Sequence, residues 1–185
     1  MSAHDKLTVL AVSLPLVIFA VMADTQRAAA DTDVEYVAKA MTAAPREIAA
    51  HATIMRITHG SMQTLKAGTN EITCMIMAGG PMCASPIGMD WVYAWQTHGP
   101  PPDGLGLIYR LSGGTGMSNT DPWATNPTPG NHWVKTGAHI MMVGLPVKKM
   151  LGFPRTLDPD STKPFVMWSG TPYEYVIIPL AGNPP

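Results

Sequence analysis

Apolar and polar residues alternate over several short segments of the chain, which is the pattern of β-strands with one buried face. In residues 47–58, Ile48, Ala50, Ala52 and Ile54 occupy every second position, so an extended chain places them on one side. The other segments are rich in the β-branched and aromatic residues that strands favour. We therefore predict strands over 47–58, 62–66, 71–77, 105–111, 138–143, 165–168 and 173–180. Because Ala67-Gly68-Thr69-Asn70 supplies two residues that accept a positive φ, the second and third strands are predicted to form a hairpin.

Helical spacing is confined to short segments. Residues 33–44 begin with Asp33, end before Pro45 and carry apolar residues on one face, so we predict a helix there. A single helical turn is predicted over 147–151. These helices are few beside the seven predicted strands.

A second amphipathic helix is predicted over about 85–98. Ser85 is a favoured N-cap, and Pro86 is tolerated in the first turn. Trp91 and Trp95 lie four residues apart and therefore share one face, and Gly99 ends the helix. We expect this tryptophan stripe to pack in the core.

The order of these elements predicts the fold class. Strands and helices do not alternate as they would in a parallel βαβ protein. We therefore predict an α+β, β-dominated fold: an antiparallel sandwich or partly open barrel with one packed amphipathic helix. The 17 glycines, 18 prolines and a charged fraction of 14% agree with a loop-rich β protein. A net charge of −1 without a basic cluster excludes nucleic acid as the expected partner.

The first thirty residues have the layout of a secretory signal. Residues 7–23 form an apolar run preceded by Lys6, and Ala28-Ala29-Ala30 has the small residues of a signal-peptide cleavage site. The alternative is an uncleaved membrane anchor, although the run is short for a span and contains Pro15. We predict a signal peptide over 1–30 and a single periplasmic or secreted domain over 31–185. No stable membrane insertion is expected after cleavage.

Cys74 and Cys83 are the two cysteines of the chain. An oxidising compartment favours a disulfide between them, closing a small loop. The competing interpretation is a pair of thiolate metal ligands, but their spacing does not match that of zinc sites.

The segment 113–142 contains most of the candidate chemistry. His132 and Asp121 lie in one loop, and together they could form a general base with its orienting partner, or bind a metal ion. The alternative is structural, because Ser118, Asn119 and Asp121 are residues whose side chains often bond their own backbone in turns.

His139 and Met141 are two residues apart on a predicted strand and therefore point to the same face. Imidazole and thioether ligands suit copper, above all Cu(I). With His132 as a third ligand, the candidate cofactors are copper or zinc. Alternatively, both side chains fill the core, a role for which methionine is well suited.

Five motifs together resemble a family of secreted bacterial proteins to which no activity is assigned. They are Gly68-Thr69-Asn70 with Thr73-Cys74, Pro81-Met82-Cys83, Ser118-Asn119-Thr120-Asp121-Pro122, Gly137-Ala138-His139-Ile140-Met141, and the segment 167–173 that ends in Thr171-Pro172-Tyr173. The resemblance covers about 45–179. The chain departs from the family pattern at two positions. Ala138 stands where the pattern has the proline of Gly-Pro-His, and Tyr175 stands where it has a histidine. The resemblance therefore implies secretion but no reaction.

Three functional hypotheses follow. The first is a binding module for a small molecule or metal ion, with His132, His139, Asp121, Asn119 and Tyr173 as candidate binding residues. The second is a hydrolytic or redox enzyme that uses His132, His139 and Asp121, although no serine lies in a G-x-S-x-G motif. The third is an envelope structural or interaction protein that contacts a partner or a copy of itself. The first two require these side chains to converge in one pocket.

Overall fold

The computed structural model describes residues 32–58 and 61–180. The predicted signal peptide lies outside them. The described elements, in order, are α1 (Asp33–Met41), α2 (Arg46–Ala49), β1 (Thr53–Thr58), β2 (Ser61–Lys66), β3 (Thr73–Met77), β4 (Gly80–Ala84), α3 (Pro86–Thr97), β5 (Gly106–Arg110), β6 (Met117–Ser118), β7 (Trp133–Val134), β8 (His139–Val143), the 3-10 helix η1 (Leu145–Lys149), β9 (Phe165–Met167) and β10 (Tyr175–Pro179). None of the described helices has the length and apolar character needed to cross a membrane.

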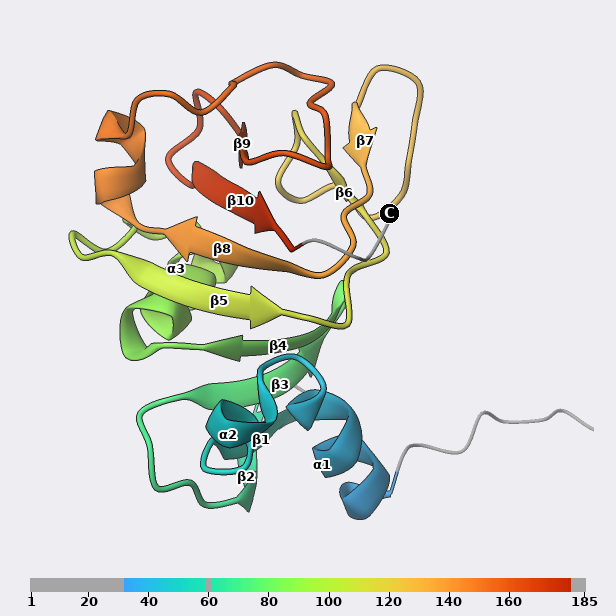
Figure 1. Ribbon diagram of the computed structural model, residues 1–185, viewed down its shortest axis with the longest axis vertical. Helices are drawn as coiled ribbons and strands as arrows, with labels where there is room; N and C mark the ends of the chain where they lie inside the picture. Colours follow the sequence, from blue (N-terminus) through green and yellow to red (C-terminus); the bar gives the residue numbers. More distant parts are fainter. Residues whose placement is uncertain (1–31, 59–60, 181–185) are drawn as a thin grey trace, which may run out of the picture. The chain divides into compact units, whose positions relative to one another are not determined.

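One large open sheet organises these elements (Figure 1). Its eight strands follow the order β2-β1-β3-β4-β5-β8-β10-β9, and β6 and β7 form a separate two-stranded sheet. Neighbouring strands of the large sheet are antiparallel, except β1 and β3, which are parallel. The predicted α+β, β-dominated class is confirmed, and the sheet is not closed into a barrel.

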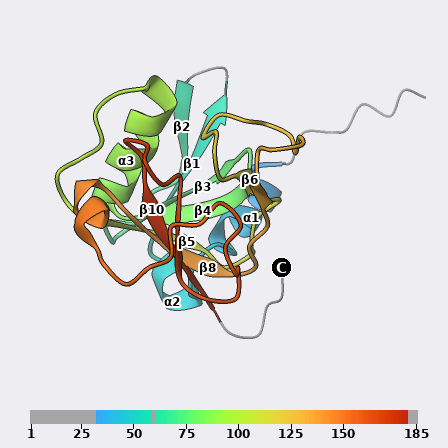
Figure 2. The same ribbon diagram turned by 90° about the horizontal axis from the view of Figure 1, so that it is seen from above.

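Helices cover both faces of this sheet (Figures 1 and 2). On one face, α1 and α2 pack with Cys74 and Cys83, and on the other Met75 and Met82 pack with α3. The alternation along β3 and β4 therefore separates two apolar clusters. The predicted helix over 85–98 is confirmed as α3, with Ser85 as its N-cap.

The structure corrects two predictions near β1. The predicted strand over 47–58 starts with the helix α2, and only Thr53–Thr58 is extended. The predicted hairpin between β2 and β3 is wrong, because β2 pairs with β1 and β3 lies parallel to β1. The Asn70 side chain bonds the Ile48 carbonyl and the Ile72 N–H. The segment 67–72 is thereby held as a crossover against the chain before β1.

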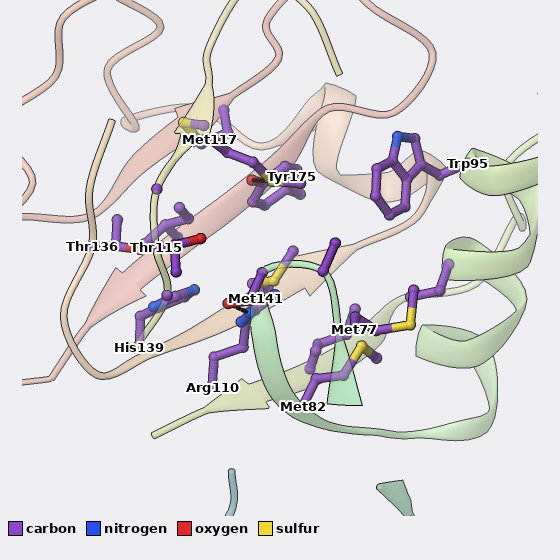
Figure 3. Close-up of a pocket in the computed structure, with 18 of the residues that line it drawn as sticks. Met77, Met82, Trp95, Arg110, Thr115, Met117, Thr136, His139, Met141 and Tyr175 are labelled. Atoms are coloured by element: carbon purple, nitrogen blue, oxygen red, sulfur yellow. Dashed lines mark hydrogen bonds between the residues drawn. The ribbon is translucent and has the colours of Figure 1, made fainter. Parts of the chain in front are cut away.

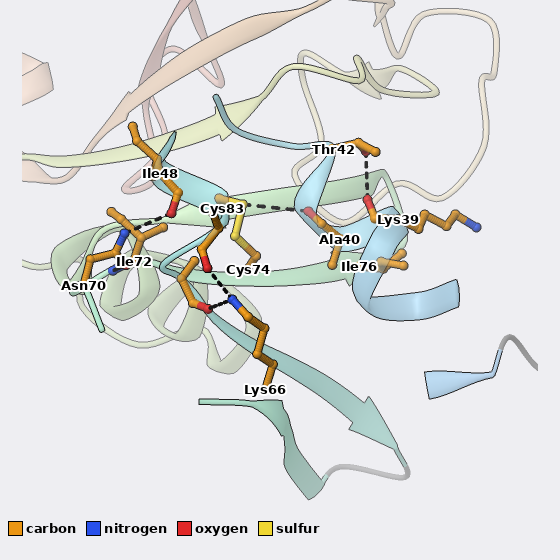
Figure 4. The surroundings of a disulfide bond; sticks show 12 residues. Lys39, Ala40, Thr42, Ile48, Lys66, Asn70, Ile72, Cys74, Ile76 and Cys83 are labelled. Carbon is orange, nitrogen blue, oxygen red and sulfur yellow. Dashed lines mark hydrogen bonds between the residues drawn. A yellow bond between two sulfur atoms is a disulfide. The ribbon is translucent and has the colours of Figure 1, made fainter. Parts of the chain in front are cut away.

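The predicted disulfide between Cys74 and Cys83 is confirmed (Figure 4). The two residues are directly opposed in the β3–β4 hairpin, with their Cα atoms 4.0 Å apart. Both are fully buried beneath α1. The bond therefore fixes the hairpin whose turn, Ala78-Gly79, reaches the cavity described next.

Candidate functional site

A cavity of about 350 Å³ lies on the α3 face of the large sheet (Figure 3). The sheet supplies the floor through alternate residues of β5, β8 and β10, while α3 and the strands β6 and β7 supply walls. A volume of this size lies in the range of small-molecule sites. Exposed lining residues show where it opens; they are Ile57, Ala78, Gln96 and Thr115.

Stacked aromatic rings form one wall of the cavity. The rings of Trp91 and Trp168 are 5.9 Å apart and nearly parallel, and Trp95 is 5.5 Å from Trp168. The Tyr175 ring meets Trp168 edge-on at 4.9 Å. Aromatic pairs in these arrangements attract each other beyond the burial of their area. The wall is therefore a rigid apolar surface.

Methionines supply much of the remaining apolar lining. Their thioethers adapt to irregular shapes and make favourable contacts with aromatic rings. The cavity can therefore accept apolar groups of different shape. The lining methionines are Met77, Met82, Met117, Met141 and Met167.

Arg110 carries the positive charge of the cavity. Its Nη2 donates a hydrogen bond to the Gly79 carbonyl, while its buried Nε has no partner. No carboxylate of residues 32–58 or 61–180 forms an ion pair with it. Burial accordingly lowers the pKa of Arg110. The guanidinium is therefore a cation without a counter-ion in the described part of the chain.

His139 is the direct cross-strand partner of Arg110 and is 3% exposed. Its Nδ1 lies 2.7 Å from the Gly137 carbonyl, which only accepts, so Nδ1 carries the proton and Nε2 is left as an acceptor. Burial lowers the pKa of His139 to about 4, and Arg110 adds to this shift, whereas the Gly137 carbonyl opposes it. His139 is therefore neutral at pH 7.

Tyr175 lies on the next strand, β10, and also lines the cavity. Burial raises the pKa of its hydroxyl, which Arg110 partly opposes. The hydroxyl lies 3.9 Å from the Met117 sulfur, which is a weak acceptor. Tyr175 is thus a neutral donor that a stronger acceptor would engage.

The stability of the protein is expected to fall as the pH decreases from 6.5 toward 4. The folded pKa of His139 is about 4 and its ordinary value is 6.5, so the unfolded state binds the extra proton in this window. The loss from this one group reaches about 3 kcal/mol once the pH is below both values. Urea unfolding at pH 7 and pH 4.5 of the parent chain and of the His139→Gln variant measures this loss of unfolding free energy. The charged and titratable neighbours of His139 are Arg110 and Tyr175. An equal pH dependence in both chains would contradict this prediction.

The structure separates the residues that the sequence grouped together. His139 and Met141 both line the cavity from one face of β8, as predicted. His132 is not among the lining residues, and its Nδ1 lies 2.9 Å from Asp158 Oδ1. The predicted meeting of His132, His139 and Asp121 therefore does not occur in this cavity.

The other sequence-predicted residues hold the loops instead. Asp121 accepts a hydrogen bond from the Trp123 N–H, which agrees with the structural alternative. Asn119 is buried, donates to the Thr156 and Leu157 carbonyls and accepts from the Trp168 N–H. The Tyr173 hydroxyl donates to the Gly99 carbonyl at 2.8 Å. These side chains position the cavity wall without lining it.

The charge at the cavity bears on the metal hypothesis. Among the described residues, no group of three or more His, Cys, Asp or Glu side chains could hold a metal ion. Next to His139, the Arg110 charge repels a cation and attracts an anion. The arrangement of His139 and Met141 therefore favours an anionic or neutral ligand over copper or zinc.

Sequence reasoning missed Arg110, Tyr175 and the tryptophan wall as site residues. The sequence feature that could have identified Arg110 is its position as an arginine in the otherwise apolar segment 105–111. Its meeting with His139 depends on the β5–β8 register. Comparison of the chain with protein-family models, curated proteins and solved structures finds no match. The functional assignment therefore rests on the geometry of the cavity.

Proposed function

We propose that this protein is a binding module for a small organic molecule with an apolar body and a polar end. The observation that carries the proposal is the cavity of about 350 Å³, with its stacked tryptophans and a polar end at Arg110, His139 and Tyr175. Such cavities, apolar with few polar groups, are typical of small-molecule sites.

The composition of the lining favours binding over catalysis. No serine, cysteine or carboxylate of the described residues lines the cavity. His139, with a pKa of about 4, is a weak general base at neutral pH. A binding role needs only shape, apolar area and fixed hydrogen-bonding groups, all of which are present.

The disulfide supports a location in the periplasm or outside the cell, because such bonds persist in oxidising compartments. We therefore propose an exported binding module. The resemblance to secreted bacterial proteins, which is carried by the quoted motifs, agrees with this location.

A neutral fluorescent probe tests the proposal. N-phenyl-1-naphthylamine, whose fluorescence rises in apolar surroundings, should bind the chain saturably. The double variant Ala78→Trp, Thr115→Trp narrows the opening of the cavity and should weaken this binding about tenfold or more, which corresponds to about 1.4 kcal/mol. Both positions are exposed, so the fold should tolerate the change.

Tyr93→Trp is the matched control, because Tyr93 is 69% exposed and lies on α3 outside the cavity lining. It should bind the probe like the parent chain. Absence of saturable binding by the parent chain, or equal binding by the narrowed variant, would contradict the proposal and favour the interaction-protein hypothesis.

A further inference from the structure

The cavity contains unsatisfied hydrogen-bond donors. Two buried side-chain atoms of the described residues have no partner, Trp91 Nε1 and Arg110 Nε. Both are N–H donors, and both belong to residues that line the cavity. Buried polar groups without partners are rare and costly in folded proteins. The two orphan donors therefore point to a ligand that brings acceptors.

The buried Arg110 guanidinium also favours a negatively charged partner. A cation buried without a counter-ion is destabilising, whereas a guanidinium with a carboxylate forms a strong charge-assisted pair. The acidic side chains of the described residues do not supply that partner. An anionic acceptor for Arg110 is therefore left for a ligand to supply, as far as the described residues are concerned.

The guanidinium is held in place by its surroundings. Nη2 is fixed by the Gly79 carbonyl. A Cβ added at Gly79 would lie 2.9 Å from Nη2, and one added at Gly114 would lie 3.7 Å from it. The glycine at position 79 lets the backbone approach the guanidinium closely, whereas the contact at Gly114 is an ordinary van der Waals contact. The charge is thus positioned before any ligand arrives, which lowers the cost of binding.

We propose that the ligand is an organic acid, whose carboxylate pairs with Arg110 while its apolar body lies against the tryptophan wall; this deepens the proposed binding function and rests on it. Tyr175 supplies a second donor to the anionic end, because its present acceptor is only a thioether. His139 Nε2 accepts from any hydroxyl or amine that the ligand carries near its carboxylate.

A carboxylate fits this site better than a phosphate monoester. Arg110 brings one positive charge, and His139 is neutral at pH 7. A monocarboxylate is therefore balanced, whereas a phosphate dianion would bring a second charge into a largely apolar cavity at a high desolvation cost.

Matched ligands with one apolar body test the inference. We expect 4-phenylbutanoate to bind the parent chain at least tenfold more tightly than 4-phenylbutan-1-ol and more tightly than 4-phenylbutyl phosphate, as measured by calorimetry and by displacement of N-phenyl-1-naphthylamine. Arg110→Met should remove the preference for the acid while changing the affinity for the alcohol less than about threefold. Arg110→Lys keeps the positive charge but loses the planar set of guanidinium donors, so this variant should retain part of the preference for the acid.

The outcomes separate the two proposals. Binding of the neutral probe and the alcohol with no preference for the acid would overturn the inference and leave the binding module intact. A preference for the phosphate would also overturn it. If Arg110→Met does not fold, the ratio of the affinities of the parent chain for the acid and for the alcohol still tests the inference. If neither the probe nor any ligand of the series binds, the binding function itself fails.

Discussion

Replacing Trp168 by alanine is expected to lower the free energy of unfolding by about 3–5 kcal/mol, the range for removing a large buried aromatic side chain. Trp168 is 1% exposed, stacks on Trp91 and lies tilted against Trp95. Its Nε1 donates to the Ser118 carbonyl at 2.8 Å in a buried environment. The alanine variant would lose the stacking and leave this carbonyl without its donor.

Trp168→Phe separates these contributions, because it keeps an aromatic ring and removes the indole N–H. We expect an intermediate loss, of which the missing hydrogen bond accounts for about 1–2 kcal/mol. Urea unfolding followed by circular dichroism gives both values. A loss below about 1 kcal/mol for the alanine variant would show that the ring does not support the wall.

Gly106→Ala is also expected to destabilise the protein, with a loss of about 2–3 kcal/mol from overpacking. A Cβ at Gly106 would lie 2.5 Å from the Gly88 nitrogen and 2.8 Å from the Ile87 carbonyl carbon, which are backbone atoms of α3. The helix would have to move away from β5. Since α3 carries Trp91 and Trp95, we expect binding of the neutral probe to weaken as well.

The control for Gly106→Ala is Gly130→Ala. No heavy atom lies within 4 Å of a Cβ added at Gly130, so its cost comes only from its positive φ of 85°. We expect a loss of about 1 kcal/mol and unchanged probe binding for this control. Comparable losses of stability and binding in the two variants would contradict the close α3–β5 contact.

The fold was predictable where local signals agree. Ser85 and Pro86 mark the start of α3, and apolar segments with β-branched or aromatic residues locate β5, β8 and β10. Near β1 the local signal was misleading. Gly68 and Asn70 favour a hairpin in isolation, but their hydrogen bonds to Thr53 and Ile48 stabilise a crossover. Tertiary contacts of this kind are not encoded in the residue pattern of the turn.

The candidate site was predictable only in part. The period of two places His139 and Met141 on one face of a strand, and both line the cavity. Their most important neighbour, Arg110, reaches them through the β5–β8 register, which is set by long-range pairing. The loop residues Asn119 and Asp121 have the composition of a binding loop, yet their side chains are used by backbone groups. Sequence composition does not distinguish a loop that binds a ligand from one that holds its own turns.

The most direct test of the account is the indole N–H spectrum of the protein labelled with ¹⁵N-tryptophan during titration with 4-phenylbutanoate. Three of the five tryptophans, Trp91, Trp95 and Trp168, line the cavity. We predict the largest saturable shifts at these three signals, above all at Trp91, whose Nε1 has no partner in the structure. Saturation that leaves these three signals unchanged would contradict the assignment of the cavity as the binding site. No saturable shift at any tryptophan would contradict the proposal that the ligand is an organic acid.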